Sequence, residues 1–543
     1  MKKTEYNTCH NRGDQGVKNI TSSVYSFEKF RNEGYLYVDK TEFIWNLINP
    51  AGESYFLSRP RRFGKSLTIS TLKAVFEGKK DLFKGLAIYD KPYDWKPYPV
   101  IHLDMANCQA KTPQALEDFI FDTLVGLSEE HKVKLRGRSN AKRFEFFIND
   151  VAEKGNGSVV ILLDEYDKPI LNTLSGPAAL ECRDVLKGFY SSIKKCEGKL
   201  RFAFITGVSK FCHVSLFSDL NNLTDITMNA KYATMLGYTQ EEFEINFTEQ
   251  IEAVDKIQER SHQDFLAEIK KWYDGFRFHA SSESVYNPVS LASFFEHGGE
   301  FSNYWFETGT PSFLLELIMK SKLDFSVSLN NPVSSSFFNA FEISDLDPLV
   351  LLFQTGYLTV DRVAQRQVPF TDKTITEYYL RFPNREVEES FNNSLLAYCT
   401  TVRKQDSQEL ILNLITAVGS GDADEFMKLF QSIFAGIPYN IHVKDEHYYQ
   451  TVCYVICELL KIMVQAEVFT SNGRIDMMVA AGEWIYVIEF KLNKSADQAM
   501  RQIENKAYAM KYRKEGKKIM LLGVNFDSEA GNITNWIKEE YHG

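Results

Sequence analysis

The chain has 543 residues, of which 44% are hydrophobic, and a formal net charge of −10. This length allows about two to four globular domains, and the hydrophobic content is ample for large cores. The acidic balance argues against indiscriminate binding to nucleic acid, so any contact with a nucleic acid has to be local.

Sequence features also predict the compartment. The segment MKKTEYNTCH has two lysines but no apolar run behind them, so we expect no signal peptide. No stretch of eighteen apolar residues occurs, which predicts a protein without membrane contact. The eight cysteines form no CxxC pair. We therefore expect reduced, mostly buried thiols in a soluble cytoplasmic protein.

The first motif lies in SYFLSRPRRFGKSLTISTLKAVF, where an apolar strand runs into Gly64, Lys65 and Ser66 and then into a helical pattern. This is the context of a phosphate-binding loop. Backbone N–H groups at the helix start hold phosphates, Lys65 reaches the outer phosphates, and the Ser66 hydroxyl can bind Mg²⁺. The full pattern requires a glycine five residues before Gly64, where this chain has Arg59. The shape of the loop is therefore left open.

Later strands end in polar residues that can complete such a site. The apolar residues 159–163 predict a buried parallel strand that ends in Asp164 and Glu165. Asp164 is a candidate for holding Mg²⁺ through water, and Glu165 can orient the attacking water. A strand in LRFAFITGVSKF ends in Thr206, a candidate sensor of the outer phosphate, and PVIHLDMAN, residues 99–107, predicts another strand that ends in an acid. Strands and helices in this order predict a doubly wound α/β sheet that binds nucleotide at its switch point, rather than a buried structural turn.

Several segments together resemble the AAA-ATPase-like proteins of bacteria: RPRRFGKS, LLDEYDKPI, TGVSKF, LFSDLNNLTDIT, WYDGFRF and VYNP. The resemblance implies a P-loop domain that binds ATP and Mg²⁺ through Lys65, Ser66, Asp164 and Glu165. Arg277 in WYDGFRF has two interpretations, a nucleotide contact and a structural charge in an aromatic-rich lid, and the second is favoured. AAA-type ATPases often form rings, so the resemblance also allows a homo-oligomer. No arginine that a neighbour would supply can be singled out.

The middle of the chain is rich in aromatic residues and helical patterns and contains no chemistry that we can assign. It predicts a helical lid followed by a helical connector. SGDAD, residues 420–424, predicts a break between two helices. We divide the chain into a P-loop domain (1–245), a helical lid and connector (246–435) and a C-terminal domain (436–543).

The C-terminal segment GRIDMMVAAGEWIYVIEFK, residues 473–491, predicts two strands joined by a turn at Gly482. Such a hairpin can bring Asp476, Glu489 and Lys491 together, and period-two alternation places Glu489 and Lys491 on one face. Two carboxylates suit Mg²⁺, which keeps several waters. A lysine beside them can activate water and stabilise charge that develops on a phosphate. The alternative is an exposed hairpin with solvated charges.

Helical patterns flank this hairpin. Upstream, DEHYYQTVCYVICELLKIMV predicts an amphipathic helix with Glu446 and Glu458 as candidates for a third carboxylate. Downstream, SADQAMRQIENKAYAMKYRKEGKK predicts a helix that carries Gln502, and IMLLGVNF predicts a buried strand. A zinc site at Cys453 and Cys457 is disfavoured, because both cysteines lie on the apolar face of the upstream helix.

This order of elements resembles the PD-(D/E)xK nuclease superfamily, which has a restriction-endonuclease-like α/β fold, over roughly residues 440–540. By this resemblance the site residues are the metal ligands Asp476 and Glu489, the catalytic Lys491, Gln502 on the second helix, and Glu446, or Glu458 in its place, on the first. AAA-ATPase-like proteins commonly end in such a domain. The two resemblances therefore agree in their order along the chain and together cover most of it.

Residues 491–518 contain nine basic and three acidic residues, which fits a local surface for a phosphate backbone, with an ordinary solvated helix face as the alternative. We expect a nucleic acid partner, DNA rather than RNA. The combined hypothesis is an ATP-hydrolysing protein coupled to a Mg²⁺-dependent nuclease. Two hypotheses compete with it. One is a nucleotide-gated protein whose nuclease-like domain binds DNA or a partner without cutting, and the other is an ATPase that remodels proteins.

Overall fold

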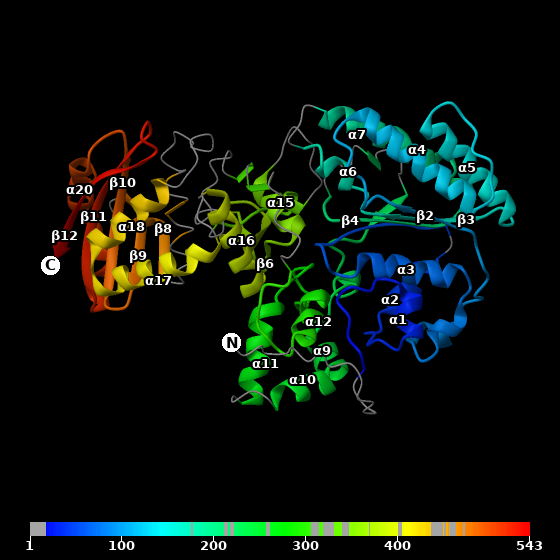
Figure 1. Cartoon of the computed structure of the whole chain (residues 1–543), viewed down its shortest axis with the longest axis horizontal. Coiled ribbons are helices and arrows are strands. Elements are labelled where there is room, and N and C mark those ends of the chain that lie inside the picture. Colours follow the sequence, from blue (N-terminus) through cyan, green and yellow to red (C-terminus); the bar gives the residue numbers. More distant parts are fainter. Residues whose placement is uncertain are drawn as a thin grey trace, which may run out of the picture. The chain divides into compact units, whose positions relative to one another are not determined.

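The chain folds into two compact units, Met1–Trp305 and Phe306–Gly543, shown in Figure 1. The computed structural model describes residues 18–50, 52–174, 178–210, 216–217, 222–256, 261–305, 314–315, 317–318, 331–338, 347–368, 370–399, 404–435, 449, 452–453, 456, 463–470 and 473–542. Each unit contains its own main sheet, so each is described by itself.

The first unit is built on a five-stranded parallel sheet with the strand order β2-β3-β4-β1-β5. Its strands are β1 (Ser54–Ser58), β2 (Val100–Asp104), β3 (Val159–Asp164), β4 (Leu200–Gly207) and β5 (Leu223–Asp225). Strands β1 and β3 are buried along their whole length, as expected for parallel strands with helices on both faces. The consecutive strands β1 and β2 are not neighbours, which creates the predicted switch point beside β1.

Helices cover both faces of this sheet, with α3 on one side and α4, α5 and α7 on the other (Figure 1). Side-chain caps begin several of them: the Thr112 hydroxyl accepts the Ala115 N–H at α4, and the Ser139 hydroxyl accepts the Lys142 N–H at α5. The α-helices of the sheet region are α1 (Phe27–Asn32), α2 (Thr41–Ile48), α3 (Lys65–Phe76), α4 (Pro113–Glu130), α5 (Asn140–Lys154), α6 (Lys168–Leu171) and α7 (Ala179–Lys195). Short 3-10 helices are η1 (Lys80–Phe83), η2 (Ala87–Asp90), η3 (Glu197–Lys199) and η4 (Ala230–Tyr232).

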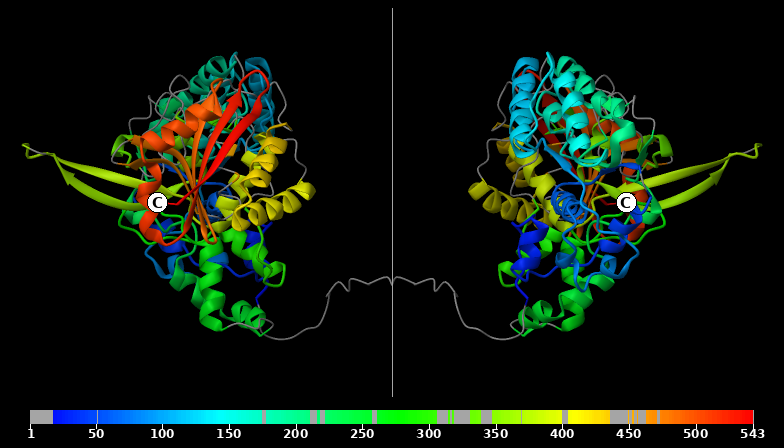
Figure 2. Two further views of the ribbon diagram at one scale, coloured as in Figure 1. Left: turned by 90° about the vertical axis from the view of Figure 1, so that its left-hand side faces the viewer. Right: turned by 90° about the vertical axis from the view of Figure 1, so that its right-hand side faces the viewer.

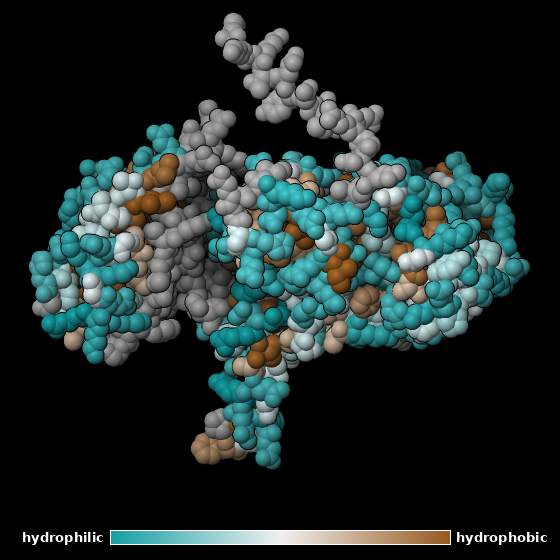
Figure 3. Space-filling view, turned by 90° about the horizontal axis from the view of Figure 1, so that it is seen from below, coloured by the Kyte–Doolittle hydropathy of each residue, from teal (hydrophilic) through white to brown (hydrophobic). Residues whose placement is uncertain are grey.

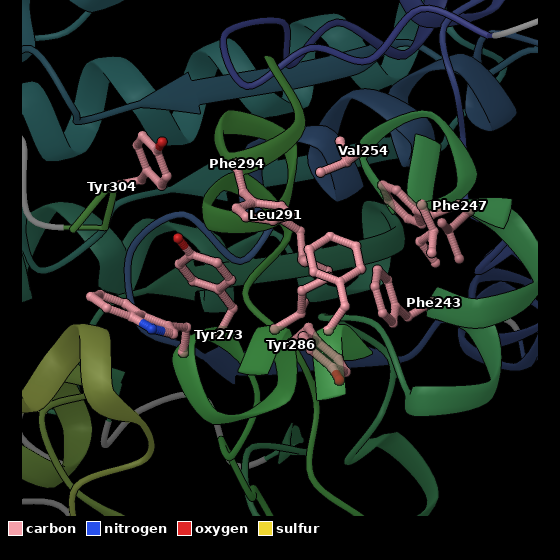
Figure 4. Packing of buried hydrophobic residues seen from close by; sticks show 13 residues of the cluster. Phe243, Phe247, Val254, Tyr273, Tyr286, Leu291, Phe294 and Tyr304 are labelled. Atoms are coloured by element: carbon pink, nitrogen blue, oxygen red, sulfur yellow. The ribbon is translucent and has the colours of Figure 1, made fainter. Parts of the chain in front are cut away.

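A second core of the first unit lies in its helical part, which we define as residues 226–305. Its α-helices are α9 (Gln240–Asn246), α10 (Thr248–Asp255), α11 (His262–Tyr273) and α12 (Pro288–Glu296). Aromatic side chains dominate this core: Phe243 from α9, Phe247 between α9 and α10, Tyr273 from α11 and Phe294 from α12 pack together (Figure 4). The predicted aromatic helical packing is therefore present in this part of the chain.

The second unit contains a five-stranded mixed sheet with the order β12-β11-β10-β9-β8. Its strands are β8 (Met463–Thr470), β9 (Gly473–Ala481), β10 (Trp484–Leu492), β11 (Lys518–Asp527) and β12 (Asn532–Tyr541). Only β10 and β11 run parallel, and the other neighbours are antiparallel. The predicted hairpin around Gly482 and the predicted strand IMLLGVNF are thus β9–β10 and β11.

Helices lie on both faces of this sheet. The second unit contains α15 (Pro348–Thr355), α16 (Arg385–Cys399), α17 (Lys404–Ser420), α18 (Ala423–Ala435), α20 (Ala496–Asn505) and the 3-10 helices η5 (Ser335–Phe338) and η6 (Tyr508–Glu515). Helix α20 packs on the face that carries Ile485 and Val487. On the opposite face the Tyr486 hydroxyl donates to the Val418 carbonyl oxygen at 2.8 Å. Helix α17 therefore belongs to the packing of this mixed sheet.

One predicted helix break agrees with the structure, and one predicted helix differs from it. The break at SGDAD is confirmed, because α17 ends at Ser420 and Gly421 adopts a φ of 83° before α18. The single helix predicted through SADQAMRQIENKAYAMKYRKEGKK is wrong beyond Asn505. Ala507 has a φ of 50°, and the chain continues as the 3-10 helix η6. The upstream helix that carries Glu446 and Glu458 lies largely outside the described residues.

The predicted helical connector also contains a hairpin that sequence reasoning did not anticipate. Strands β6 (Thr359–Gln367) and β7 (Thr374–Arg381) pair as a separate two-stranded sheet, visible as a long ribbon in Figure 2. A 2.8 Å ion pair between Arg366 and Glu377 joins the strands. Because the compact units divide between Trp305 and Phe306, the domain limits predicted after residues 245 and 435 stay a proposal.

The surface and the buried thiols can be compared with what the sequence predicts for them. The face shown in Figure 3 is mainly hydrophilic, with hydrophobic residues in separate patches. Among the helices that the structure describes, none combines the length and the apolar character that a membrane crossing requires. Cys108, Cys182, Cys196 and Cys453 are buried free thiols, in agreement with the predicted reduced cysteines.

Close packing of α20 against β11 generates a stability prediction. A Cβ at Gly523 would lie 2.6 Å from the Ala496 carbonyl oxygen. Gly523→Ala should therefore destabilise the second unit by about 1–3 kcal/mol. Gly419→Ala is the control, because this glycine lies in α17 with nothing within 4 Å of its Cβ position and should gain about 0.5–1 kcal/mol. Calorimetric melting of the full chain checks both, and equal shifts for the two variants would contradict the packing argument.

Candidate functional sites

The loop between β1 and α3 carries the phosphate-binding motif. Gly64 has a φ of 87°, a backbone conformation that glycine adopts without strain, and α3 starts at the next residue. No side chain caps the N-terminus of α3 in the described part of the chain. The first N–H groups of α3 therefore keep the orientation that suits an anionic ligand.

Lys65 is almost fully buried, with 5% of its surface exposed. Its Nζ donates to the carbonyl oxygens of Arg59 and Pro60, at 3.0 Å each, and lies 3.5 Å from Glu165 Oε1. Glu165 follows β3 with a φ of 53°, which costs a residue with a Cβ about 1–3 kcal/mol. The strained backbone thus presents a carboxylate to the loop lysine.

Ser66 and Asp164 come together on neighbouring elements, with the Ser66 hydroxyl donating to Asp164 Oδ2 at 2.7 Å. Burial raises the pKa of Asp164 to about 6, although the hydrogen bond from Ser66 acts in the opposite direction. A hydroxyl and a buried carboxylate at this distance offer the hard oxygen ligands that Mg²⁺ accepts. The donor set therefore fits the implied cation.

Thr206 also lies at this edge of the sheet, on β4 beside β1. Its hydroxyl is fully buried and donates to the Leu57 carbonyl oxygen at 2.8 Å. The hydroxyl proton is therefore engaged by the β1 backbone, and a role as phosphate sensor stays a prediction.

Arg277 is half-buried, and its assignment as a structural charge likewise stays a prediction.

Sequence reasoning missed a cavity beside Gly64. Its walls come mainly from three stretches, residues 36–44, 63–71 and 235–238, together with Phe30 and Pro288, and are mostly apolar or aromatic. At its edge Lys40 Nζ lies 2.6 Å from Glu242 Oε2, which ties the segment ahead of β1 to α9. No local pattern predicts such a pocket, because tertiary folding alone brings these stretches together.

The β9–β10 hairpin positions the acids of the second unit. The paired register runs from Trp484↔Ala481 to Ile488↔Met477, and one further step places Asp476 opposite Glu489. The ladder ends there, and Asp476 Oδ2 instead accepts the Phe490 N–H at 2.8 Å. Both acids are buried, with 8% and 1% of their surfaces exposed. The sheet thus brings together the two carboxylates that the sequence singled out.

Lys491 lies against Glu489, one of these two carboxylates. Its Nζ donates to Glu489 Oε1 at 2.6 Å and to the Phe490 carbonyl oxygen at 2.9 Å. Two buried carboxylates with hard oxygen donors suit Mg²⁺ that keeps several waters. Among the described residues, no three His, Cys, Asp or Glu side chains gather as a metal site. Both candidates for the third acid, Glu446 and Glu458, lie outside those residues.

Gln502 is half-buried on α20. Helix α20 packs over Gly523, the β11 residue in register with Glu489, so this helix covers the face on which Glu489 lies. The position of the helix is compatible with the implied role of Gln502, which stays a prediction. The exposed basic residues of the segment 494–518 are Lys494, Arg501, Lys506, Lys511, Arg513, Lys514, Lys517 and Lys518.

A P-loop at the switch point of a parallel sheet and two buried acids beside a lysine on a mixed sheet define the class, an ATPase-like unit joined to a nuclease-like domain. The family described as "Predicted AAA-ATPase" matches residues 22–217, and the "PD-(D/E)XK nuclease superfamily" matches residues 444–536. A protein of Azotobacter chroococcum mcd 1, described as "Uncharacterized protein in vnfD 5'region", is 37% identical over 537 residues, which cover 96% of this chain and 99% of that protein. The chain belongs to the family of AAA-ATPase-like proteins that carry a C-terminal PD-(D/E)XK nuclease superfamily domain.

The short Lys491–Glu489 contact generates a metal-binding prediction. Lys491→Met should tighten binding of Mn²⁺, used as the probe for Mg²⁺, by about tenfold or more, because the ammonium group competes with the cation for Glu489. Lys494→Met removes the same charge from an exposed site three residues away and should leave the affinity within about twofold. Titration calorimetry measures both. Unchanged or weaker Mn²⁺ binding by Lys491→Met would refute competition by the lysine.

Proposed function

We propose that the first unit binds ATP together with Mg²⁺ and hydrolyses it. The observation that carries this proposal is the meeting of Lys65, Ser66, Asp164 and Glu165 at the carboxyl edge of the parallel sheet. The match to a predicted AAA-ATPase family supports it, because that family is described by this activity.

Each residue has a separate role in the proposed site. Lys65 exchanges its carbonyl partners for the outer phosphates, and the first N–H groups of α3 hold the inner ones. Ser66 and Asp164 would hold Mg²⁺, which neutralises phosphate charge when bound. Glu165, already presented to the loop by its backbone, orients the attacking water.

The cavity beside Gly64 is proposed to receive the nucleotide base. Its apolar and aromatic lining suits a flat, weakly polar ring, and its position next to the loop places the base within reach of a bound triphosphate. This proposal separates the contribution of the base from that of the phosphates, which bind on the loop.

Two substitutions test the ATPase proposal. Lys65→Ala should weaken ATP binding by at least about tenfold, because the phosphates lose their buried counter-charge. Glu165→Gln should keep the ATP affinity within about twofold and lower turnover by about 100-fold. Calorimetry and phosphate release measure the two effects. Glu77→Gln, at the far end of α3, is the control. ATP turnover by Glu165→Gln at the rate of the unaltered protein would remove Glu165 from the mechanism.

We further propose that the second unit cleaves nucleic acid phosphodiesters with Mg²⁺, with DNA favoured over RNA. The observation that carries this proposal is the pair of buried carboxylates at Asp476 and Glu489 beside Lys491. Asp476 and Glu489 would hold Mg²⁺, which stabilises phosphate charge when bound, and Lys491 positions the attacking water. The exposed basic residues of α20 and η6 supply the surface for the phosphate backbone.

Cleavage assays test this second proposal. Asp476→Asn should lower product formation by at least about 100-fold on a panel of end-labelled single- and double-stranded DNA and RNA, because one metal ligand loses its charge. Removal of Mg²⁺ with a chelator should stop cleavage by the unaltered protein. Asp497→Asn, an exposed acid in the first turn of α20, is the control. Equal cleavage by Asp476→Asn and the unaltered protein would exclude this site as the nuclease centre.

A regulatory protein that binds nucleic acid without cutting it is the second candidate. It is favoured by the Lys491 ammonium, which already neutralises Glu489 at 2.6 Å. The same substrate panel separates the two candidates. Retention of labelled DNA without product at any Mg²⁺ concentration supports binding alone, whereas metal-dependent products support the nuclease.

A further inference from the structure

Arg59 occupies the position at which the phosphate-binding pattern has its first glycine, and its side chain is only 1% exposed. Its own N–H donates to the Gly207 carbonyl oxygen at 3.1 Å, so the backbone of position 59 extends the contact between β1 and β4. The arginine is therefore part of the ordered start of the loop. A buried guanidinium is costly unless it is well bonded, which raises the question of what it holds.

The guanidinium of Arg59 bonds to backbone carbonyls rather than to a carboxylate. Nη1 donates to the carbonyl oxygens of Ser58 at 2.9 Å and Thr227 at 2.7 Å, and Nη2 donates to that of Tyr232 at 3.2 Å. The group also lies over the Phe278 ring, 4.0 Å from its centroid. Burial lowers the pKa of Arg59 to about 9, and the nearby Asp225 partly opposes this effect. One planar group thus links the loop to two stretches of the helical part.

A second loop residue makes parallel contacts. The Phe63 ring packs edge-on against Phe276 and Phe278, with centroids 4.8 and 5.3 Å apart. Phe63 also lines the cavity beside Gly64. Phe278, over which the Arg59 guanidinium lies, therefore also packs against a residue of one wall of this cavity.

One carbonyl group that accepts a hydrogen bond from Arg59, that of Tyr232, connects Arg59 to another wall of the cavity. Tyr232 ends η4, and its carbonyl oxygen also accepts the Met235 N–H at 3.2 Å. Met235 and the three residues that follow it line the cavity. Tyr238 and Tyr286 exchange backbone hydrogen bonds, which join this wall to the segment that contains Phe276 and Phe278.

We propose that Arg59 is a positioning residue for the nucleotide base: it fixes the helical part against the loop and so keeps the walls of the cavity beside Gly64 in place. This inference rests on the proposed ATP site and deepens it. The loop holds the phosphates through Lys65 and backbone N–H groups, whereas Arg59 acts on the base alone.

Replacing Arg59 by the glycine of the usual loop pattern gives a direct test, with ATP and inorganic triphosphate as probes. Arg59→Gly should weaken ATP binding by about tenfold or more and leave triphosphate binding within about twofold, because only the base contacts are lost. Lys65→Ala should weaken both ligands. Arg201→Gly is the matched control, since Arg201 also bonds to backbone carbonyls and lies over two aromatic rings, but at the amino end of β4. This control should leave both affinities within about twofold.

Two results would overturn the proposal. ATP binding by Arg59→Gly that is as tight as in the unaltered protein would mean that position 59 needs no side chain. An equal loss of ATP and triphosphate affinity would place the effect on the loop itself. Phe278→Leu keeps Arg59 and removes its aromatic partner, so it should also weaken ATP selectively if the glycine variant fails to fold. Retention of full ATP affinity by Phe278→Leu would equally count against the proposal.

Hydrogen exchange separates failure of this inference from failure of the proposed ATP site. If the unaltered protein binds neither ATP nor triphosphate, the ATP proposal fails. Hydrogen exchange without nucleotide then tests whether Arg59 holds the helical part against the loop. Arg59→Lys, which keeps the charge but not the planar fork, should raise amide exchange at Met235, Tyr238 and Val285 above the level in Arg201→Lys. Equal exchange in the two variants would show that Arg59 does not hold the helical part.

Discussion

A lysine held by a glutamate lies at both candidate sites, buried at the loop and half-buried at the mixed sheet, and the chemistry of each site depends on this contact. Lys65 lies 3.5 Å from Glu165, and Lys491 lies 2.6 Å from Glu489. Taking a charge out of water is expensive unless a partner of opposite sign is supplied at once. Each pair therefore compensates the charges of its site, and a ligand has to exchange one partner for another. At the loop the ligand is an anion that attracts Lys65. At the mixed sheet the ligand is a cation that competes with Lys491 for Glu489.

The parallel sheet positions the first site through its strand order. Because β1 lies between β4 and β5, the loop after β1 starts at the edge where the other strands also end. Asp164 ends β3 and Glu165 follows it at this edge, and Thr206 is the last residue but one of β4. Arg59 then adds a constraint that a glycine cannot supply, since its guanidinium reaches carbonyls of the helical part. The departure from the usual loop pattern thus couples two parts of one unit.

Much of the fold follows from local pattern. Five consecutive apolar residues ahead of Asp164 are enough to predict a central strand, and alternation in VIEFK is enough to place Glu489 and Lys491 on one face. Local sequence pattern did not predict two changes of backbone conformation, because no residue type at these places indicates the change. Ala507 takes a positive φ within a helical pattern, and residues 359–381 form a hairpin inside a region dominated by helices. Both features depend on packing that a single segment does not reveal.

The amino-acid sequence by itself determined the chemical groups of both sites, since Lys65, Ser66, Asp164, Asp476 and Glu489 are recognisable from residue type and spacing. Only the tertiary structure decided how these groups are shielded and what else joins them. The cavity beside Gly64 and the contacts of Arg59 unite stretches more than 160 residues apart, such as Arg59 and Thr227, whose bond spans 168 positions. The physical reason is that burial and hydrogen bonding depend on neighbours in space, and long-range neighbours leave no periodic trace in the chain.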